Sequence, residues 1–481
     1  MQQVPSSHLH ISKSANLKLV LIAILIQVSV FSLNTYQEKK YKPEQYDHTV
    51  FAITCGDTPS YTEPIDNLLA TGTYKSDSEE AGYSLNGRTP YYGIFYGFFR
   101  LFAEPHVAQD CLVILQLIIK IFSNTALFYL VLLLTGSRPV AWIAFLCYCC
   151  LAWASVYTPR VLTESLSQSF LIFGLYSFFL WLKLHRKRHF IFAALLLSYV
   201  ICMRPFLLPA IGLFVLVNIY FNPATKPLVG KLKQAVLFFI PLVLFIAPWT
   251  VRNYVVSKKL IVFQESVNAG YHYTSSDISL RYFLTAVGEN FIAWDYSAAG
   301  CWFDPNLEKF STYEIPNSIL CESVTKEKLE LAKYHYGTKT LTGSVEDDRI
   351  ADSLFVAMRN GFMEEKPAYY YVISPVKIAV DAFCHDGVEL LQRKQWYELV
   401  YKIGQSGLFI LISLGFVCCM VFRKFRNGGY LWIIPVMLAV VLCFGFRFCE
   451  KRYFIYAYPI FIIYAAVFFE FILRRIKVLK Q

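Results

Sequence analysis

Two short polar stretches, residues 55–61 and 87–93, contain the side chains in this sequence that are best suited to chemistry. Asp57 and Tyr61 lie in the first stretch, and Arg88 and Tyr92 lie in the second. A carboxylate can accept a proton from a reacting group, and an arginine can hold a phosphate with two parallel hydrogen bonds. The two stretches therefore predict acid–base chemistry beside an anion, with Asp57 at the chemical centre.

The chain that must position these residues is strongly apolar. Of its 481 residues, 56% are hydrophobic, 17% are aromatic and only 16% are charged, and the mean hydropathy is +0.43. This composition is typical of a polytopic membrane protein. The formal net charge of +11 comes from Lys and Arg in short loops between apolar runs. Without a basic helix carrying interleaved aromatics, and without zinc-finger spacing, we expect no nucleic-acid partner.

The apolar runs predict the fold class, because a membrane-spanning helix needs about 20 largely apolar residues. Candidate runs lie at residues 17–34, 109–134, 139–157, 163–183, 189–203, 206–221, 234–250, 404–422, 430–446 and 453–473. We therefore predict an all-α polytopic membrane protein with about ten, and up to twelve, transmembrane helices. We expect the first run to be a retained signal anchor. The aromatic run 89–103 is too short to span and is predicted to be an interfacial helix.

The charges of the loops predict the orientation in the membrane. Basic residues with almost no acidic neighbours occupy both terminal segments and alternate turns: Lys13, Lys18, Arg138, Lys183, Arg186, Lys187, Arg188, Lys226, Lys231, Lys233, Arg423, Lys424, Arg426, Arg474, Arg475, Lys477 and Lys480. The positive-inside rule then makes both termini cytoplasmic. The long loops at residues 34–108 and about 251–403 face outward.

This topology divides the chain into three parts. We expect an N-terminal transmembrane catalytic module at 1–254, an extracytoplasmic α or α+β domain at 255–403, and C-terminal transmembrane helices at 404–481. Within the extracytoplasmic domain, the sequence predicts helices over 347–365 and 369–391, because Pro367 interrupts the pattern between them.

The cysteines give no metal-binding pattern. Most of the 13 lie in apolar runs, where Cys behaves as a small hydrophobic residue. Four lie in the outward loops, where disulfides can form with a connectivity that the sequence does not predict: Cys55, Cys301, Cys321 and Cys384.

The predicted orientation brings charged side chains from distant segments to one membrane face. They are Asp57, Arg88, Arg160, Glu164, Arg204, Arg252, Arg447, Glu450, Lys451 and Arg452. Charged groups beside apolar segments are costly and are usually functional or paired. Arginines suit a phosphate, carboxylates suit acid–base or metal chemistry, and an apolar wall suits a lipid tail. The pattern predicts a site for a lipid that carries a phosphate.

The order of these motifs resembles the GT-C superfamily of integral-membrane glycosyltransferases. The motifs are Asp57-x-x-x-Tyr61, Arg88-x-Pro90-x-Tyr92, Thr163-Glu164, Arg204-Pro205, Pro248-Trp249-x-x-Arg252-Asn253, and Arg452-Tyr453 before a last span that contains proline. The branch they resemble comprises bacterial relatives of the protein O-mannosyltransferases and of the lipid A aminoarabinose transferase. The resemblance covers residues 15–255 and 440–470.

The resemblance implies a GT-C-like fold and an inverting transfer of a sugar on the outer face of a membrane. The donor would be a sugar on undecaprenyl- or dolichyl-phosphate, and the acceptor an envelope glycan, a lipid or a protein. A bacterial inner membrane is the expected location, with membrane lipids as further partners.

The resemblance also implies roles for single residues. Asp57 would act as the general base on the acceptor hydroxyl, and Glu164 would position the acceptor or help to hold a cation. The residues that would bind the carrier phosphate or line the sugar site are Arg88, Arg204, Arg252, Arg452, Tyr61 and Tyr92. Some relatives use Mg²⁺ or Mn²⁺, for which Asp57 and Glu164 are the candidate ligands, although no pattern here demands a metal.

Each residue also has a purely structural interpretation. An Asp before Pro59 is typical of a helix cap or turn, and an acid at the start of a helix, such as Glu164, is favoured by the helix dipole. Arginines at a membrane interface anchor headgroups. For Tyr61, Tyr91 and Tyr92, an aromatic belt is the favoured interpretation.

Two other functions remain open at this point. An O-antigen-type ligase would transfer a whole glycan from a diphosphate carrier. A lipid-linked glycan transporter or flippase would place charged residues at the middle of the membrane, where Lys120 is the main charged residue of the spans.

Overall fold

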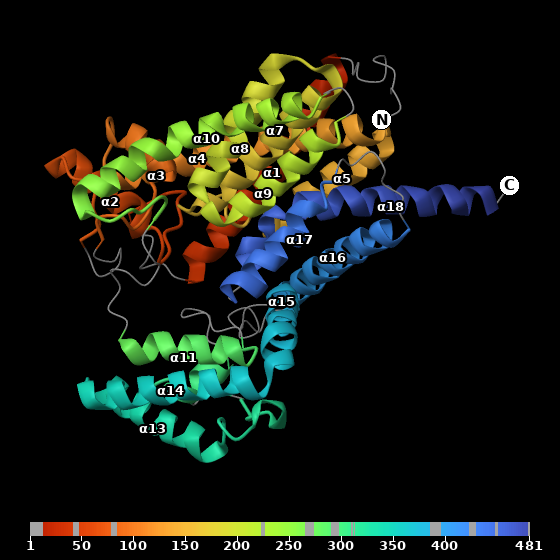
Figure 1. Cartoon of the computed structure of the whole chain (residues 1–481). Helices are drawn as coiled ribbons and strands as arrows, with labels where there is room; N and C mark the ends of the chain where they lie inside the picture. Colours follow the sequence, from red (N-terminus) through yellow and green to blue (C-terminus); the bar gives the residue numbers. More distant parts are fainter. Residues whose placement is uncertain are drawn as a thin grey trace. The chain divides into compact units, whose positions relative to one another are not determined.

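The computed structural model describes residues 13–41, 48–77, 84–222, 227–264, 274–289, 298–308, 311, 313–384, 396–422, 430–447 and 451–479. These residues are mostly helical (Figure 1). The β-type pairings among them are two isolated bridges, Ile53 with Arg160 and Ser76 with Ser84. The predicted all-α class is therefore confirmed for the described part of the chain.

The chain divides into two compact units. The first comprises Met1–Tyr271, Val400–Pro435 and Ile455–Gln481, and the second comprises His272–Leu399 and Val436–Phe454. We call them unit 1 and unit 2. Three of the described helical elements contain residues of both units, namely α16 (Trp396–Val421), α17 (Ile433–Ala439) and the 3₁₀ segment Lys451–Tyr456.

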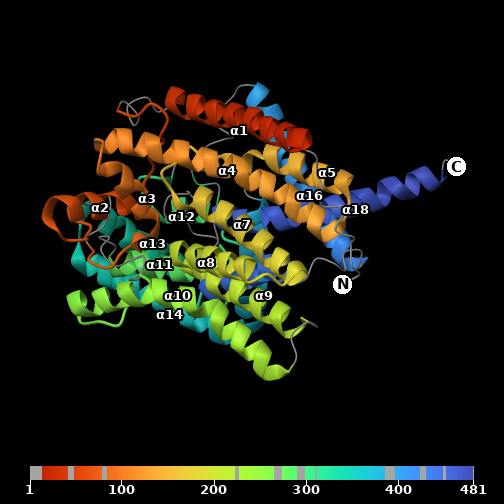
Figure 2. The same cartoon turned by 90° about the horizontal axis from the view of Figure 1, so that it is seen from above.

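Unit 1 contains most of the apolar helices. Its elements are α1 (Lys13–Tyr41), α2 (Pro59–Thr71), α3 (Pro90–Arg100), α4 (Pro105–Thr135), α5 (Arg138–Cys150), α6 (Ala152–Ser155), α7 (Thr163–Leu184), α8 (Lys187–Met203), the 3₁₀ turn Pro205–Leu207, α9 (Leu208–Tyr220), α10 (Leu228–Ser257) and α18 (Tyr458–Leu479). In Figure 1, α4, α7, α8 and α10 run side by side, and Figure 2 shows α1 along α4.

Proline and glycine define several helix ends in this unit. Pro59, Pro90 and Pro105 open α2, α3 and α4. Proline suits the first helical position, because its φ is already helical and no carbonyl partner is needed there. Gly136 ends α4 with φ 70°, in the left-handed region that favours glycine.

Each predicted apolar run contains a helix, but the run 139–157 is divided at Leu151 into α5 and the short α6. Four of the described helices are long and apolar enough to cross a membrane: Asn16–Lys40, Pro105–Thr135, Thr163–Leu184 and Leu228–Ser257. Shorter apolar helices lie at Arg138–Cys150, Pro205–Tyr220, Ile410–Val421 and Ile433–Phe446. These helices support a membrane protein, and the total of ten to twelve spans stays a prediction.

Unit 2 is built from shorter helices around its own aromatic core. Its described elements include α11 (Ser275–Ala286), α12 (Ala298–Phe303), α13 (Lys326–Thr342), α14 (Val345–Glu365), the π-helical turn Tyr369–Ile373, α15 (Ser374–Cys384) and the π-helical segment Val440–Phe446. Phe283, Phe303 and Phe355 are buried in its core. The helix α11 packs along α14, and so does α13 (Figure 1).

The predicted interruption at Pro367 is confirmed. The helix α14 ends at Glu365, and the helical backbone resumes after the proline through the π-helical turn into α15. Residues 385–391 of the second predicted helix lie outside the described residues.

Two glycines give a matched test of helix packing in unit 1. A Cβ at Gly174 of α7 would lie 2.6 Å from Leu197 Cδ2 of α8, whereas a Cβ at Gly212 of α9 would meet nothing within 4 Å. We expect Gly174→Ala to lower the free energy of unfolding by about 1–3 kcal/mol, because overpacking forces the two helices apart. Gly212→Ala should be neutral or stabilising by up to about 1 kcal/mol. Thermal unfolding in detergent measures both, and equal stabilities would contradict the close approach.

Candidate functional site

Asp57 lies in a turn directly before α2. The turn is closed by a 2.8 Å bond from the Thr58 amide to the Cys55 carbonyl, and Ser60 Oγ donates to the Asp57 carbonyl at 2.6 Å. The N-cap of α2 is Thr58, so Asp57 stands one residue before the capping position. Its carboxylate is 15% exposed and accepts a hydrogen bond from Arg88 Nη2 at 3.2 Å.

The guanidinium group of Arg88 contacts residues in and just before the first turn of α2. Besides its ion pair with Asp57, its Nε donates to Ser60 Oγ at 3.2 Å, and its Cζ lies 4.9 Å from the centre of the Tyr61 ring. The two halves of the predicted site, 31 residues apart in sequence, are thus in contact. The Asp57–Arg88 pair is partly exposed and can be reached by a ligand.

The tyrosines form the layer beneath this ion pair. The rings of Tyr61 and Tyr92 meet edge to face with centroids 5.2 Å apart, and Tyr92 Oη donates to Gln116 Oε1 of α4 at 3.4 Å. Gln116 Nε2 in turn donates to the carbonyls of Thr158 and Arg160, at 3.1 and 2.9 Å. The aromatic-belt interpretation is therefore wrong for these rings, because the protein buries them.

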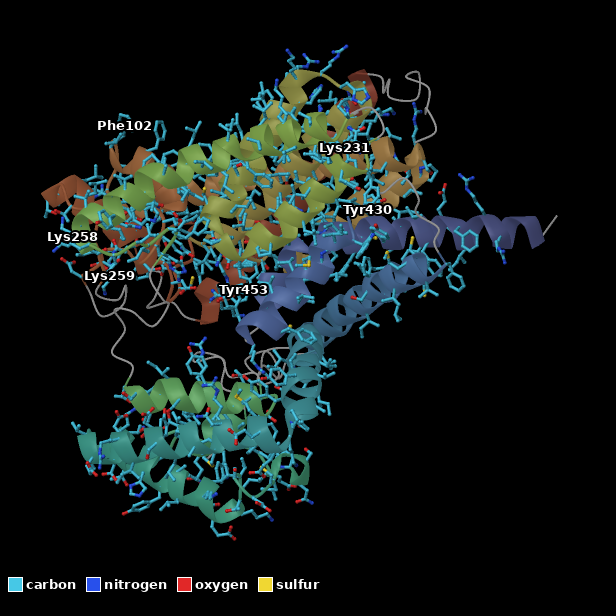
Figure 3. All side chains as sticks on the ribbon, in the orientation of Figure 1. Phe102, Lys231, Lys258, Lys259, Tyr430 and Tyr453 are labelled. Carbon is cyan, nitrogen blue, oxygen red and sulfur yellow. The ribbon has the colours of Figure 1, made fainter. Side chains whose placement is uncertain are left out.

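The helix α3 approaches α2 closely enough to hold this layer. A Cβ at Gly93 would lie 2.9 Å from Ile65 Cγ1, and one at Gly97 would lie 3.1 Å from Ile65 Cγ2. The opposite face of α3 and the residues after it expose Ile94, Phe98 and Phe102, the last being 79% exposed (Figure 3). The placement of α3 on the bilayer surface stays a prediction, and this apolar face agrees with it.

A second ion pair, Glu164 with Arg204, lies completely inside unit 1. Glu164 is in the first turn of α7, Arg204 follows α8 directly before Pro205, and Arg204 Nη2 contacts Glu164 Oε1. Their side chains are 0% and 7% exposed. Tyr456 lies against the same turn, 2.7 Å from Ser167 Oγ through its hydroxyl. This pair is closed to solvent.

Electrostatics connects the two ion pairs. Burial raises the pKa of Tyr92 well above its usual value; the neighbouring Tyr61, Glu164 and Cys55 raise it further, and Arg204 opposes them. Burial likewise raises the pKa of the Cys55 thiol, which feels both Asp57 and Glu164. Asp57 of the exposed pair and Glu164 of the buried pair thus both act on Cys55, and Glu164 and Arg204 also act on Tyr92.

Asp110 in the first turns of α4 fixes the segment that leads into the site. Its carboxylate accepts hydrogen bonds from the backbone amides of Val50, Phe51 and Ala52 at 2.8, 2.7 and 2.7 Å. The next residue, Ile53, forms the bridge to Arg160. Asp110 thus holds the strand-like approach to Cys55 and Asp57 against the turn before α7.

The contacts of Arg252 lie in the segment before Arg88, and those of Arg452 include the ring of Tyr453. Arg252 of α10 donates to Asn86 Oδ1 at 3.0 Å and to the carbonyls of Leu85 and Tyr74. Arg452 belongs to unit 2, where its guanidinium lies 5.3 Å from the Tyr453 ring. Their predicted phosphate contacts are untested.

Asp57 and Glu164, the candidate metal ligands, are each paired with an arginine. Among the described residues there is no group of three or more His, Cys, Asp and Glu side chains that could hold a metal ion. Asp57 is bound by Arg88 and Glu164 by Arg204, so that a cation would have to displace two guanidinium groups. We therefore assign no chemical step to a metal.

Three of the four cysteines in the long loops lie among the described side chains. Cys55, Cys301 and Cys321 are free thiols. The side chain of Cys384 lies outside the described part of the structure.

Sequence reasoning missed the residues that hold the site together: Asp110, Gln116, Tyr74, Asn86 and Tyr456. A signal exists for Gln116, because this polar residue lies four positions before Lys120 in an apolar run, on the same face of one helix. Tyr74, Asn86 and Tyr456 carry no comparable signal, because their partners are distant in sequence.

Comparison with known proteins gives one similar structure. No protein-family model and no curated protein matches the chain. The chain is similar to the crystal structure of an Archaeoglobus fulgidus oligosaccharyltransferase, tethered to an acceptor peptide containing an NVT sequon, with 12% identity and a TM-score of 0.47. The match covers 97% of this chain and 50% of that one, so the chain spans about half that enzyme's length. We infer no function from a likeness of this degree.

The role of Asp110 gives a direct test of the site's construction. In Asp110→Asn, one carboxylate oxygen becomes an NH₂ group that cannot accept a bond, and the negative charge is lost. Because hydrogen bonds to a charged group contribute about 1.5–3 kcal/mol each, we expect the 50–53 segment to open. Hydrogen exchange of its amides should accelerate at least about tenfold, while the amides of α7 stay protected. Unchanged exchange at residues 50–52 would contradict this anchoring role.

Proposed function

We propose that this chain is a membrane glycosyltransferase that moves a sugar from a polyprenyl-phosphate donor to a hydroxyl group of an acceptor on the outer face of the membrane. The observation that carries the proposal is the partly exposed Asp57–Arg88 pair, with Tyr61 beside it and with Glu164 of the buried pair acting, as Asp57 does, on Cys55. A carboxylate and a guanidinium side by side supply the two functions that the transfer needs.

The proposed step begins with the acceptor at Asp57. The carboxylate takes the proton of the acceptor hydroxyl as its oxygen attacks the anomeric carbon of the sugar. The bond from that carbon to the phosphate oxygen breaks, and its electron pair stays on the phosphate. Attack from the face opposite to the leaving phosphate inverts the anomeric configuration.

Arg88 is the arginine that can reach the departing phosphate. Its side chain is 20% exposed, whereas that of Arg204 is 7% exposed and faces Glu164. A phosphate bound at Arg88 would compete with Asp57 for the guanidinium and so make the carboxylate a better base. Arg204 would add positive charge from its buried position without contacting the donor.

The wider assignment follows from the sequence. The donor would carry an undecaprenyl or dolichyl chain, and an envelope glycan, lipid or protein would be the acceptor. The positive-inside pattern supports cytoplasmic termini and an outward-facing site, and a bacterial inner membrane is the proposed location.

Two other functions would give different products. An O-antigen-type ligase would release a polyprenyl diphosphate from a diphosphate-linked glycan. A transporter or flippase would move the lipid-linked sugar across the membrane without breaking a covalent bond. Release of polyprenyl monophosphate by the purified protein separates the proposed function from both.

The role of Asp57 as a base is tested by replacing its carboxylate with an amide. In Asp57→Asn, the amide has nearly the same shape but cannot take the proton, and we expect release of polyprenyl phosphate from a radiolabelled donor to fall at least about 100-fold. The matched control is Asp66→Asn in α2, the helix that follows Asp57, because Asp66 is also a partly exposed carboxylate, paired with Arg100 at 2.7 Å. Full turnover by correctly folded Asp57→Asn would refute the base assignment.

A second prediction concerns divalent cations. Because arginines already occupy both carboxylates, we expect EDTA to leave the turnover of the donor unchanged, within about twofold. Turnover would be measured after chelation and again after addition of Mg²⁺ or Mn²⁺. Loss of turnover that Mn²⁺ restores would contradict the assignment of the arginines.

A further inference from the structure

We propose that Arg252 is a positioning residue, which holds the segment before Arg88 so that Arg88 stays on Asp57. This inference rests on the function proposed above, because it concerns the same reaction. In this proposal Arg252 acts through Arg88 and does not contact the phosphate itself.

The guanidinium group of Arg252 is directed into the first outer loop. Nη1 donates to Asn86 Oδ1 at 3.0 Å and to the Leu85 carbonyl, and Nη2 donates to the Tyr74 carbonyl. A further bond from Nη1 reaches Asn253 Oδ1 at 3.1 Å. Both terminal nitrogens therefore point at oxygens of the protein, and a phosphate bound here would have to displace the carbonyls.

Two aromatic rings enclose the same group. The Cζ of Arg252 lies 5.6 Å from the Tyr74 ring centre and 5.1 Å from that of Trp249, and these rings meet edge to face at 5.4 Å. Tyr74 and Trp249 are both buried. An arginine between ring faces keeps a fixed orientation, because its planar group stacks as well as donates.

The clamped segment leads directly to Arg88. Tyr74 Oη donates to the Arg88 carbonyl at 3.1 Å, and Asn86 stands two residues before Arg88 with only 1% of its surface exposed. The bridge between Ser76 and Ser84 joins the residues that follow Tyr74 to those that precede Asn86. Beyond Arg88, Thr89 Oγ1 donates to the Cys202 carbonyl at 2.8 Å. Arg88 is thus fixed from both sides.

The last turns of α10 provide a firm base for Arg252. The chain after the helix folds back on these turns: Asn253 Nδ2 donates to the Ile261 carbonyl at 3.0 Å, and Thr250 Oγ1 donates to the Val262 carbonyl at 3.2 Å. Trp249 Nε1 donates to the Phe263 carbonyl. Asn253 is completely buried. Trp249, Arg252 and Asn253 of the motif Pro-Trp-x-x-Arg-Asn therefore act together as a clamp.

A double-mutant cycle with Arg88 tests the proposal kinetically. We expect Arg252→Gln to lower kcat about 10-fold or more with the donor KM changed less than about threefold, since misplacing a catalytic group affects the reacting state. In the Arg88→Gln background the same change should cost less than about threefold, because the group that it positions is absent. Arg252→Lys should not restore kcat, since an ammonium cannot reach the same set of acceptors.

Two kinetic outcomes would overturn the proposal. One is a large rise in the donor KM of Arg252→Gln with kcat unchanged, which indicates direct binding of the phosphate. The other is a full, multiplicative loss when Arg252→Gln is added to Arg88→Gln, which indicates that the two arginines act separately.

A second readout is independent of the sugar-transfer reaction. Cys55 is a free thiol in the turn that precedes Asp57, and its alkylation by N-ethylmaleimide can be followed by peptide mass spectrometry. Release of Arg88 should loosen this turn, so we expect Arg252→Gln to accelerate alkylation of Cys55 at least about threefold. Lys258→Gln is the matched control, because it removes an exposed cation from the end of the same helix (Figure 3).

The two readouts separate the two proposals. A wild-type protein that consumes no polyprenyl-phosphate sugar refutes the proposed function, and the Cys55 rates still decide whether Arg252 holds the loop. Equal alkylation rates in Arg252→Gln, Lys258→Gln and the wild type would refute the clamp, whatever the protein catalyses.

Discussion

The buried ion pair between Glu164 and Arg204 is the constraint on which the site depends. Neither charge is stable alone in an apolar interior, so that the start of α7 and the end of α8 must meet there. Tyr456 reaches the same turn through Ser167, and Tyr92 lies within its electrostatic range. The pair thus holds the start of α7 close to Val161, whose carbonyl accepts a hydrogen bond from Thr58 Oγ1 at 3.3 Å.

The two ion pairs differ in what they can exchange. Asp57 and Arg88 keep contact with solvent, so an anionic ligand can take the guanidinium and release the carboxylate at modest cost. Glu164 and Arg204 cannot change partners in this way, because an unpaired charge would remain buried. Both pairs consist of a carboxylate and a guanidinium group. The reactivity of the exposed pair and the rigidity of the buried pair therefore follow from their difference in solvent exposure.

Sequence reasoning could predict the helices and the central residues of the site for separate reasons. Apolar runs of sufficient length predict helices locally, and a charged residue beside such a run indicates a paired or functional position. This reasoning from the sequence points to Asp57, Arg88 and Glu164. The burial of Tyr92 and the clamp at Arg252 depend on contacts over tens of residues, as in the bond from Arg252 to Tyr74. Local patterns carry no information about such contacts.

The irregular backbone around α6 and before α7 explains why the polar residues Gln116 and Lys120 lie inside the apolar helix α4. Irregular backbone at membrane depth is tolerated only where protein groups satisfy it. Lys120 Nζ donates to the Ala154 carbonyl at 2.8 Å, and Gln116, one helical turn earlier, donates to the carbonyls of Thr158 and Arg160. Lys120 also donates to Gln168 Oε1 at 2.8 Å, one turn after Glu164. This buried lysine is therefore better explained as a support of the broken backbone, which places Glu164 at the start of its helix, than as part of a transport path.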